Sequence, residues 1–217
     1  MDEMIRQFPL LQEKQNGKRL VYLDNSATTQ RPQAVLDAVE QFYSKDNANP
    51  HRGVYELGER ATAAYEDARA QVASFLNAPK EEVIFTRNAT ESLNLIAYCW
   101  GLHHLKAGDR VVVSILEHHS NLIPWQQVCR AAGAELTFLY TGQDGVISDE
   151  EIEKKITKGV KLVAFTHVSN VLGLVSPVEK IVSRAHEVGA VTVLDCAQSA
   201  PLTQLDVERS ALRTIQH

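Results

Sequence analysis

The stretch EVGAVTVLDCAQSA, residues 187–200, decides the fold class. Gly189 stands where a helix would end, and the β-branched run at 190–195 is typical of a buried strand. The strand closes on a carboxylate, Asp195, which is costly to bury unless a cation pairs with it. This short segment therefore predicts a helix-to-strand unit with a polar group at the strand's carboxyl end.

The same pattern recurs upstream, where four further apolar runs lie. They are EEVIFT (81–86), DRVVVSIL (109–116), AELTFLY (134–140) and VKLVAFTH (160–167). A glycine precedes each of the last three, at Gly108, Gly133 and Gly159, as expected where a helix ends. The repeated order of helix, glycine and strand predicts an α/β fold, a mostly parallel sheet with helices on both faces.

Helix signals fill the intervals between these runs and the region before them. Ser148 with Glu151 and Ser176 with Pro177 are typical helix starts. Before residue 80 the chain is mainly helical, at about 30–45 and 58–77. We therefore expect an N-terminal arm and helical segment over 1–80, and a large domain over 81–217.

Composition limits the class of protein. The 217 residues carry a formal net charge of −5, which disfavours a nucleic-acid partner. No apolar run approaches the roughly 20 residues of a membrane span, and the acidic N-terminus does not resemble a signal peptide. Cys99, Cys129 and Cys196 have no spacing typical of disulfides or zinc, so we expect a cytoplasmic protein with no metal site.

Ligands of parallel sheets bind at the carboxyl ends of the strands, so the residues that follow each run are the candidates. After the first run, Asn88 and Glu91 can cap a helix. The open backbone N–H groups around Ala89 and Thr90 would then suit a phosphate. A capping box without any ligand explains the same residues.

The later runs are followed by further polar candidates. His118 and His119 come after the second run, although neighbours in an extended chain face opposite sides and a surface role is the alternative. Asn170 follows the fourth run and can equally be a turn residue. Asp195 and Gln198 follow the fifth, and Asp195 can alternatively cap a helix or form an internal salt bridge.

One cofactor suits all of these groups. The chain has no G-x-G-x-x-G and no complete P-loop, which leaves dinucleotides and ATP unsupported. Pyridoxal 5′-phosphate combines a phosphate, a flat ring and a pyridine nitrogen that works best protonated. A helix N-terminus can bind its phosphate and an imidazole can stack on its ring, while Asp195 keeps the nitrogen protonated and Gln198 binds the ring hydroxyl.

Six stretches give the chain a family resemblance. In chain order they are VYLDNSATTQRP (21–32), NPHRGVYELGERAT (49–62), FTRNATESLNLIA (85–97), EHHSNLIPWQ (117–126), HVSNVLG (167–173) and VLDCAQSAP (193–201). They make the chain resemble the SufS-like, group II cysteine desulfurases of the class V aminotransferase family, which are pyridoxal phosphate enzymes of fold type I. The resemblance implies removal of sulfur from L-cysteine, giving alanine and an enzyme persulfide for iron–sulfur cluster assembly.

The resemblance also implies roles for individual residues. Ala89 and Thr90 would hold the phosphate, and His118 would stack on the ring and move protons. Asn170 would contact the cofactor hydroxyl and the substrate carboxylate, and Arg52 would reach the substrate region, either of its own subunit or of a partner subunit. Asp195 and Gln198 keep the cofactor roles given above. The family's homodimer and a sulfur-acceptor protein are the partners implied.

The chain departs from the family pattern after Asp195. The family has an S-G-H-K motif whose lysine forms the Schiff base, whereas the last lysine here is Lys180 and the chain ends at His217. Its persulfide-forming cysteine is missing too, and Cys196, next to Asp195, is no substitute. We therefore expect the N-terminal part of such an enzyme, with an incomplete large domain that is inactive alone. Selenocysteine lyase, another class V lyase and a non-catalytic stub are the alternatives.

Overall fold

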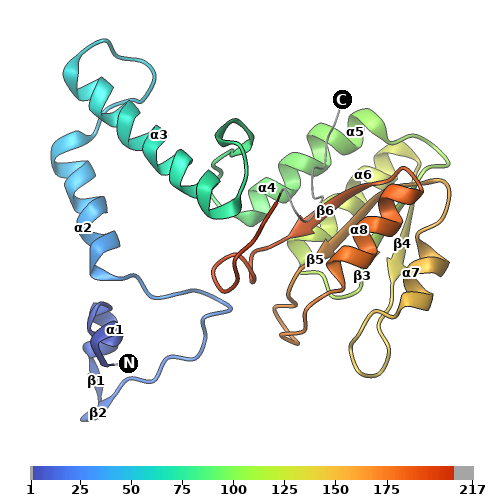
Figure 1. Cartoon of the computed structure of the whole chain (residues 1–217), viewed down its shortest axis with the longest axis horizontal. Coiled ribbons are helices and arrows are strands. Elements are labelled where there is room, and N and C mark those ends of the chain that lie inside the picture. Colours follow the sequence, from blue (N-terminus) through green and yellow to red (C-terminus); the bar gives the residue numbers. More distant parts are fainter. Residues whose placement is uncertain (1, 208–217) are drawn as a thin grey trace. The chain divides into compact units, whose positions relative to one another are not determined.

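The structure, a computed structural model, describes residues 2–207 (Figure 1). By its internal contacts the chain divides into two compact units, with the boundary between Gln71 and Val72. The first unit is mainly helical, and the second holds a parallel sheet. Helix α3 (Glu56–Leu76) crosses the boundary.

Besides the larger part of α3, the first unit holds short helices and one hairpin. Their bounds are α1 (Asp2–Arg6), η1 (Pro9–Gln12), β1 (Lys14–Gln15), β2 (Lys18–Arg19), α2 (Gln33–Gln41) and η2 (Phe42–Asp46). The helices expected at about 30–45 and 58–77 are confirmed as α2 with η2 and as α3. The hairpin was not expected. It turns at Asn16 and Gly17, both of which have positive φ angles.

The second unit alternates helices with strands. Its helical elements are η3 (Lys80–Glu82), α4 (Ala89–Ile96), η4 (Ala97–Gly101), α5 (Leu102–His104), η5 (His119–Asn121), α6 (Ile123–Ala132), α7 (Asp149–Lys155) and α8 (Val178–Glu187). Its strands are β3 (Arg110–Ser114), β4 (Glu135–Leu139), β5 (Val160–Thr166) and β6 (Val191–Asp195). All four strands lie within runs that the sequence predicts.

The sheet is parallel throughout, with the strand order β4-β3-β5-β6. Val113 of β3 pairs with Ala164 of β5, and Thr166 of β5 pairs with Asp195 of β6. The carboxyl ends of these three strands are therefore neighbours at one edge of the sheet. The predicted α/β class with a parallel sheet is confirmed.

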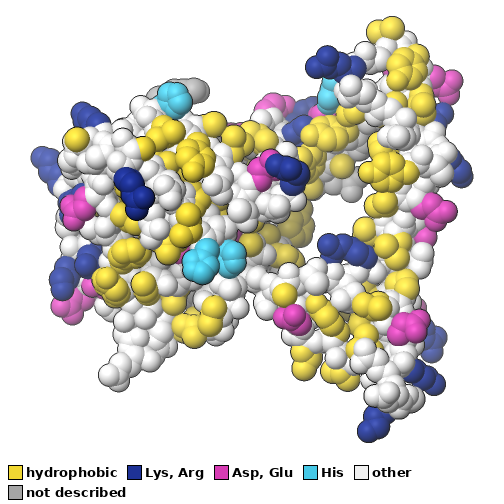
Figure 2. Space-filling view, turned by 180° about the vertical axis from the view of Figure 1, so that it is seen from behind, with side chains coloured by type: hydrophobic (Ala, Val, Ile, Leu, Met, Phe, Trp, Pro, Cys, Tyr) yellow, Lys and Arg dark blue, Asp and Glu magenta, His cyan; other side chains and the backbone are white. Residues whose placement is uncertain are grey.

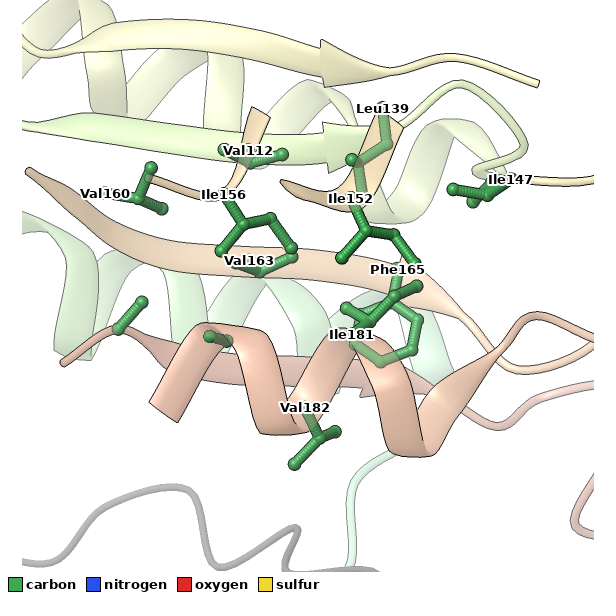
Figure 3. Packing of buried hydrophobic residues seen from close by; sticks show 12 residues of the cluster. Val112, Leu139, Ile147, Ile152, Ile156, Val160, Val163, Phe165, Ile181 and Val182 are labelled. Carbon is green, nitrogen blue, oxygen red and sulfur yellow. The ribbon is translucent and has the colours of Figure 1, made fainter. Parts of the chain in front are cut away.

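Alternate residues of each central strand enter two separate cores. Val111 and Val113 pack with Trp125 of α6 on one face, together with side chains of α4 and η4. Val163 and Phe165 pack on the other face, against α7 and α8 (Figure 3). A sheet that is covered on both faces favours continuous apolar strands, which explains why these runs are readable in the sequence.

The strand expected at 81–86 is wrong. Residues 80–82 form the 3-10 helix η3, and residues 83–86 belong to no strand of the sheet that the structure describes. Val83 does have an extended backbone, with φ −89° and ψ 117°. An apolar run becomes a strand only where another strand offers it a backbone ladder, and a hydrophobicity pattern does not specify that neighbour.

One of the two predicted helix caps is wrong. The Ser148 hydroxyl accepts a hydrogen bond from the Glu151 N–H at 3.2 Å, as predicted. Helix α8 instead begins at Val178, with Pro177 as its N-cap residue and no side-chain cap. The Ser176 N–H donates to the His167 carbonyl at 2.8 Å, so Ser176 belongs to the loop after β5 rather than to the helix.

Charges of both signs are mixed on the surface. On the face drawn in Figure 2, lysine and arginine side chains alternate with aspartate and glutamate and do not gather into one basic patch. Among residues 2–207, no helix is long and apolar enough to cross a membrane.

The backbone at Gly189 yields the first testable prediction. Its φ is 77°, a left-handed conformation, and a Cβ added there would meet no atom within 4 Å. We expect Gly189→Ala to lower the free energy of unfolding by about 1–2 kcal/mol through backbone strain alone. Gly189→Asn should lower the free energy of unfolding by less than Gly189→Ala does, since asparagine tolerates this conformation better. Urea unfolding measures both variants, and equal losses would contradict the backbone explanation.

Candidate active site

Asp195 closes β6 with a buried carboxylate. Its Oδ1 accepts a hydrogen bond from the Ala197 N–H at 2.9 Å. Its other oxygen, Oδ2, has no hydrogen bond or ion pair with any residue in the described range. One oxygen thus fixes the turn after the strand, and the second stays available to a cation. The proposed internal salt bridge is not formed within residues 2–207.

Gln198 and Asn170 lie in the turns that follow β6 and β5. Gln198 is half-buried in a turn where the Ser199 N–H donates to the Cys196 carbonyl at 3.0 Å. Asn170 is exposed, in a loop built around Ser169, whose carbonyl accepts from the Gly173 N–H at 2.9 Å. Both predicted residues therefore follow the carboxyl ends of neighbouring strands.

His118 follows β3 and is the N-cap residue of η5. Its Nδ1 accepts from the Ser120 N–H at 3.2 Å and lies 2.8 Å from the Ser120 hydroxyl oxygen. The residue is exposed. With Nδ1 accepting, a neutral imidazole carries its proton on Nε2. The exposed ring can therefore offer its Nε2–H to a ligand.

Helix α4 begins with the predicted cap. The Asn88 side chain accepts from the Glu91 N–H at 2.9 Å, and Glu91 reaches back to the Arg87 N–H at 2.6 Å. The backbone N–H groups of Ala89 and Thr90 make no hydrogen bond to the residues that the structure describes. Because α4 packs against η5, these open donors belong to the same part of the unit as the His118 segment.

Glu117 is a polar group of this region that the sequence reasoning missed. Its Oε1 accepts from the Thr166 N–H at 2.6 Å and from the Ser114 hydroxyl at 2.5 Å. The pKa of this carboxyl is raised to about 7, mainly by burial; its hydrogen bonds lower the pKa, and the charge of Asp195 contributes to the rise. A carboxylate directly after an apolar run was the available signal, the same one that singled out Asp195.

Two further residues that the sequence analysis considered are Arg52 and Cys196. Arg52 is exposed and belongs to the first compact unit, so its role at the substrate stays a prediction. Cys196 is half-buried, and burial raises the pKa of its thiol, which disfavours the reactive thiolate. Residues 2–207 contain no group of three or more His, Cys, Asp or Glu side chains arranged to hold a metal ion.

The parallel sheet thus ends β6 on an open buried carboxylate and has an exposed imidazole after β3, and the α4 helix that packs against η5 has open N–H groups. Residues 21–212 match the family described as Aminotransferase class-V. The chain therefore belongs to the class-V aminotransferase family.

Several proteins to which this chain is similar are named cysteine desulfurases. A probable cysteine desulfurase of Synechocystis sp. is 48% identical over 93% of this chain and 48% of its own length. The apo cysteine desulfurase of Thermococcus onnurineus NA1 superimposes with a TM-score of 0.90, at 41% identity over 98% of this chain and 51% of that one. The cysteine desulfurase CsdA of Escherichia coli has a TM-score of 0.86, at 36% identity over 97% of this chain and 52% of that one. The chain spans about half the length of these relatives.

Proposed function

We propose that this chain forms the cofactor-binding part of a pyridoxal phosphate-dependent cysteine desulfurase of the SufS-like, group II type. The observation that carries the proposal is the Asp195 carboxylate, buried at the end of β6 with one oxygen free of hydrogen bonds to residues 2–207. Such a group favours a cationic partner, and a protonated pyridine nitrogen has the required charge. The family membership and the cysteine desulfurase relatives support this assignment.

The residues present fit this cofactor. When bound, pyridoxal phosphate supplies an electron-withdrawing ring that weakens bonds at the substrate α-carbon. Asp195 would hold the proton on the ring nitrogen, and the N–H groups of Ala89 and Thr90 would bind the phosphate. His118 would cover the ring and move a proton at Nε2.

The remaining roles extend the proposal to the substrate and the assembly. Gln198 and Asn170 would bind the ring oxygen, and Asn170 and Arg52 would orient the substrate carboxylate. L-cysteine is the proposed substrate, with alanine and a persulfide as products. A homodimer, a sulfur-acceptor protein, iron–sulfur cluster assembly and a cytoplasmic location complete the proposal.

Cofactor binding tests the proposal directly. We expect saturable binding when the chain is titrated with pyridoxal phosphate and the ligand absorbance is followed. Pyridoxal, which lacks the phosphate, should bind at least about tenfold more weakly because it cannot use the α4 N–H groups. Equal binding of both ligands would contradict the phosphate site. Borohydride reduction and mass spectrometry identify adducts on surface lysines, which serve as the background.

Substrate choice needs a second assay. Alanine release from L-cysteine and from L-selenocysteine is compared on a protein that carries both the family's S-G-H-K segment and its persulfide-forming cysteine after this chain. We expect L-cysteine to be desulfurated. Exclusive turnover of L-selenocysteine would instead identify a selenocysteine lyase.

A further inference from the structure

One carboxylate ties the loop after β3 to the neighbouring strand. The Oε1 of Glu117 accepts from the backbone N–H of Thr166, the last residue of β5. The same side chain accepts from Ser114 within β3 and, through Oε2, from the Asn121 amide at 2.5 Å. Three donors from three places therefore converge on one side chain.

The residue of the loop that donates to Glu117, Asn121, is anchored in the core. Asn121 is fully buried, and its Oδ1 accepts from the indole Nε1–H of Trp125 at 3.0 Å. Trp125 is itself fully buried against the sheet. Because Asn121 cannot move freely, the carboxylate that it donates to is fixed as well.

The strand end of the arrangement leads to Asp195. Thr166 pairs with Asp195 across the β5–β6 ladder, and the Thr166 hydroxyl lies 3.4 Å from the Asp195 carbonyl oxygen. Glu117 is also close enough to Asp195 for the two charges to interact. The loop carboxylate is thus held directly beside the strand that carries the proposed cofactor partner.

Glu117 and His118 are consecutive residues. The His118 carbonyl accepts from the Asn121 N–H at 2.9 Å, so the His118 backbone is held between Glu117 and Asn121. Ser120 alone contacts the ring nitrogen Nδ1 within the described part of the chain, and it does not link the loop to the sheet. The link to β5 is made by Glu117.

We propose that Glu117 is a positioning residue: by binding the Thr166 N–H, its carboxylate sets where His118 lies over the carboxyl ends of β5 and β6. The proposal deepens the proposed cofactor site and rests on it. Glu117 itself touches neither the cofactor nor the substrate in this scheme. Its effect on ligand binding passes through the position of the His118 ring.

Glu117→Gln tests the proposal because the amide has the same shape but cannot accept from all three donors. We expect the Thr166 amide to exchange its hydrogen about tenfold faster, since its acceptor is weakened. The ring resonance of His118 should shift in spectra of protein with isotope-labelled histidine, assigned with His118→Gln. The affinity for pyridoxal phosphate should fall severalfold.

Glu151→Gln is the matched control. The Glu151 Oε1 also accepts a backbone N–H just after a strand, that of Tyr140 at 3.0 Å, but it lies after β4. This variant should leave the His118 resonance and the cofactor affinity unchanged. Ser114→Ala removes only one of the three donors, so it should shift the His118 resonance in the same direction but by a smaller amount. This variant also tests the proposal if Glu117→Gln fails to fold.

The readouts separate this proposal from the proposed function. The exchange rate and the His118 resonance need no cofactor, so they report on the position of the loop even if pyridoxal phosphate does not bind. A folded Glu117→Gln protein with an unchanged His118 resonance overturns the positioning role. A shifted His118 resonance in Glu117→Gln together with wild-type cofactor affinity would show that the loop moves without any effect on ligand binding. That result would also overturn the positioning role.

Discussion

Asp195→Asn is expected to weaken the binding of pyridoxal phosphate by about 10- to 100-fold, because it removes the charge that pairs with the ring nitrogen. Hydrogen bonds to charged groups contribute about 1.5–3 kcal/mol, and about 1.4 kcal/mol corresponds to a factor of ten. Asparagine keeps the size of the side chain and the Oδ1 acceptor of the Ala197 N–H. The loss should therefore appear in ligand affinity and leave the turn intact. Absorbance titration measures it.

Asp144→Asn is the control for this variant. The Asp144 Oδ1 accepts from the Val146 N–H at 3.0 Å, the same i to i+2 hydrogen bond that Asp195 makes to Ala197. Asp144 is exposed in the loop before α7, so its substitution removes an equal charge and leaves the same local contact. We expect wild-type affinity for Asp144→Asn. Equal losses in both variants would mean that net charge, rather than the position of Asp195, governs binding.

The sequence was sufficient for the sheet because local chemistry and tertiary structure agree there. Gly133 and Gly189 both have positive φ angles and end helices α6 and α8, as their positions before apolar runs indicated. The strands β3 and β5 are apolar on both faces and could be identified without knowledge of their neighbours. Both the conformational preference of these residues and their burial could be inferred from the amino-acid sequence alone.

The incorrect strand prediction and the missed hairpin share a different cause. Each element depends on whether another segment of the chain pairs with it in the folded structure. Residues 83–86 have the composition of a strand, but the pattern does not say whether a ladder is available. The hairpin at Asn16 and Gly17 was missed because its flanks, Lys14–Gln15 and Lys18–Arg19, lack the apolar alternation that signals a hairpin.

Glu117 shows the same limit at the candidate site. The rule that a carboxylate after an apolar run needs a partner applied to it as well as to Asp195. Its partners, Thr166 and Asn121, come from another strand and from the next turn, so only the folded chain identifies them. The histidines beside Glu117 were more conspicuous because histidine is common in active sites.

Phe165→Ala should cost the largest amount of stability, about 3–5 kcal/mol. Phe165 is fully buried in the central strand β5 and packs in one cluster with Ile152 of α7 and Ile181 of α8 (Figure 3). Removing the ring leaves a cavity that the sheet backbone cannot close, since both ladders of β5 hold it in place. The total stability of a domain this size is about 5–15 kcal/mol, so the variant should be close to unfolded at moderate urea concentrations.

Phe138→Ala is the matched comparison, because Phe138 lies in the edge strand β4 and is only half-buried. It should cost about 1–2 kcal/mol, since less area is lost and solvent fills the space. Urea denaturation followed by circular dichroism gives both values. Phe165→Leu should recover much of the loss, since leucine refills most of the cavity with apolar volume. A loss for Phe165→Ala no larger than that for Phe138→Ala would show that the β5 face toward α7 and α8 is not the tightly packed core of the sheet.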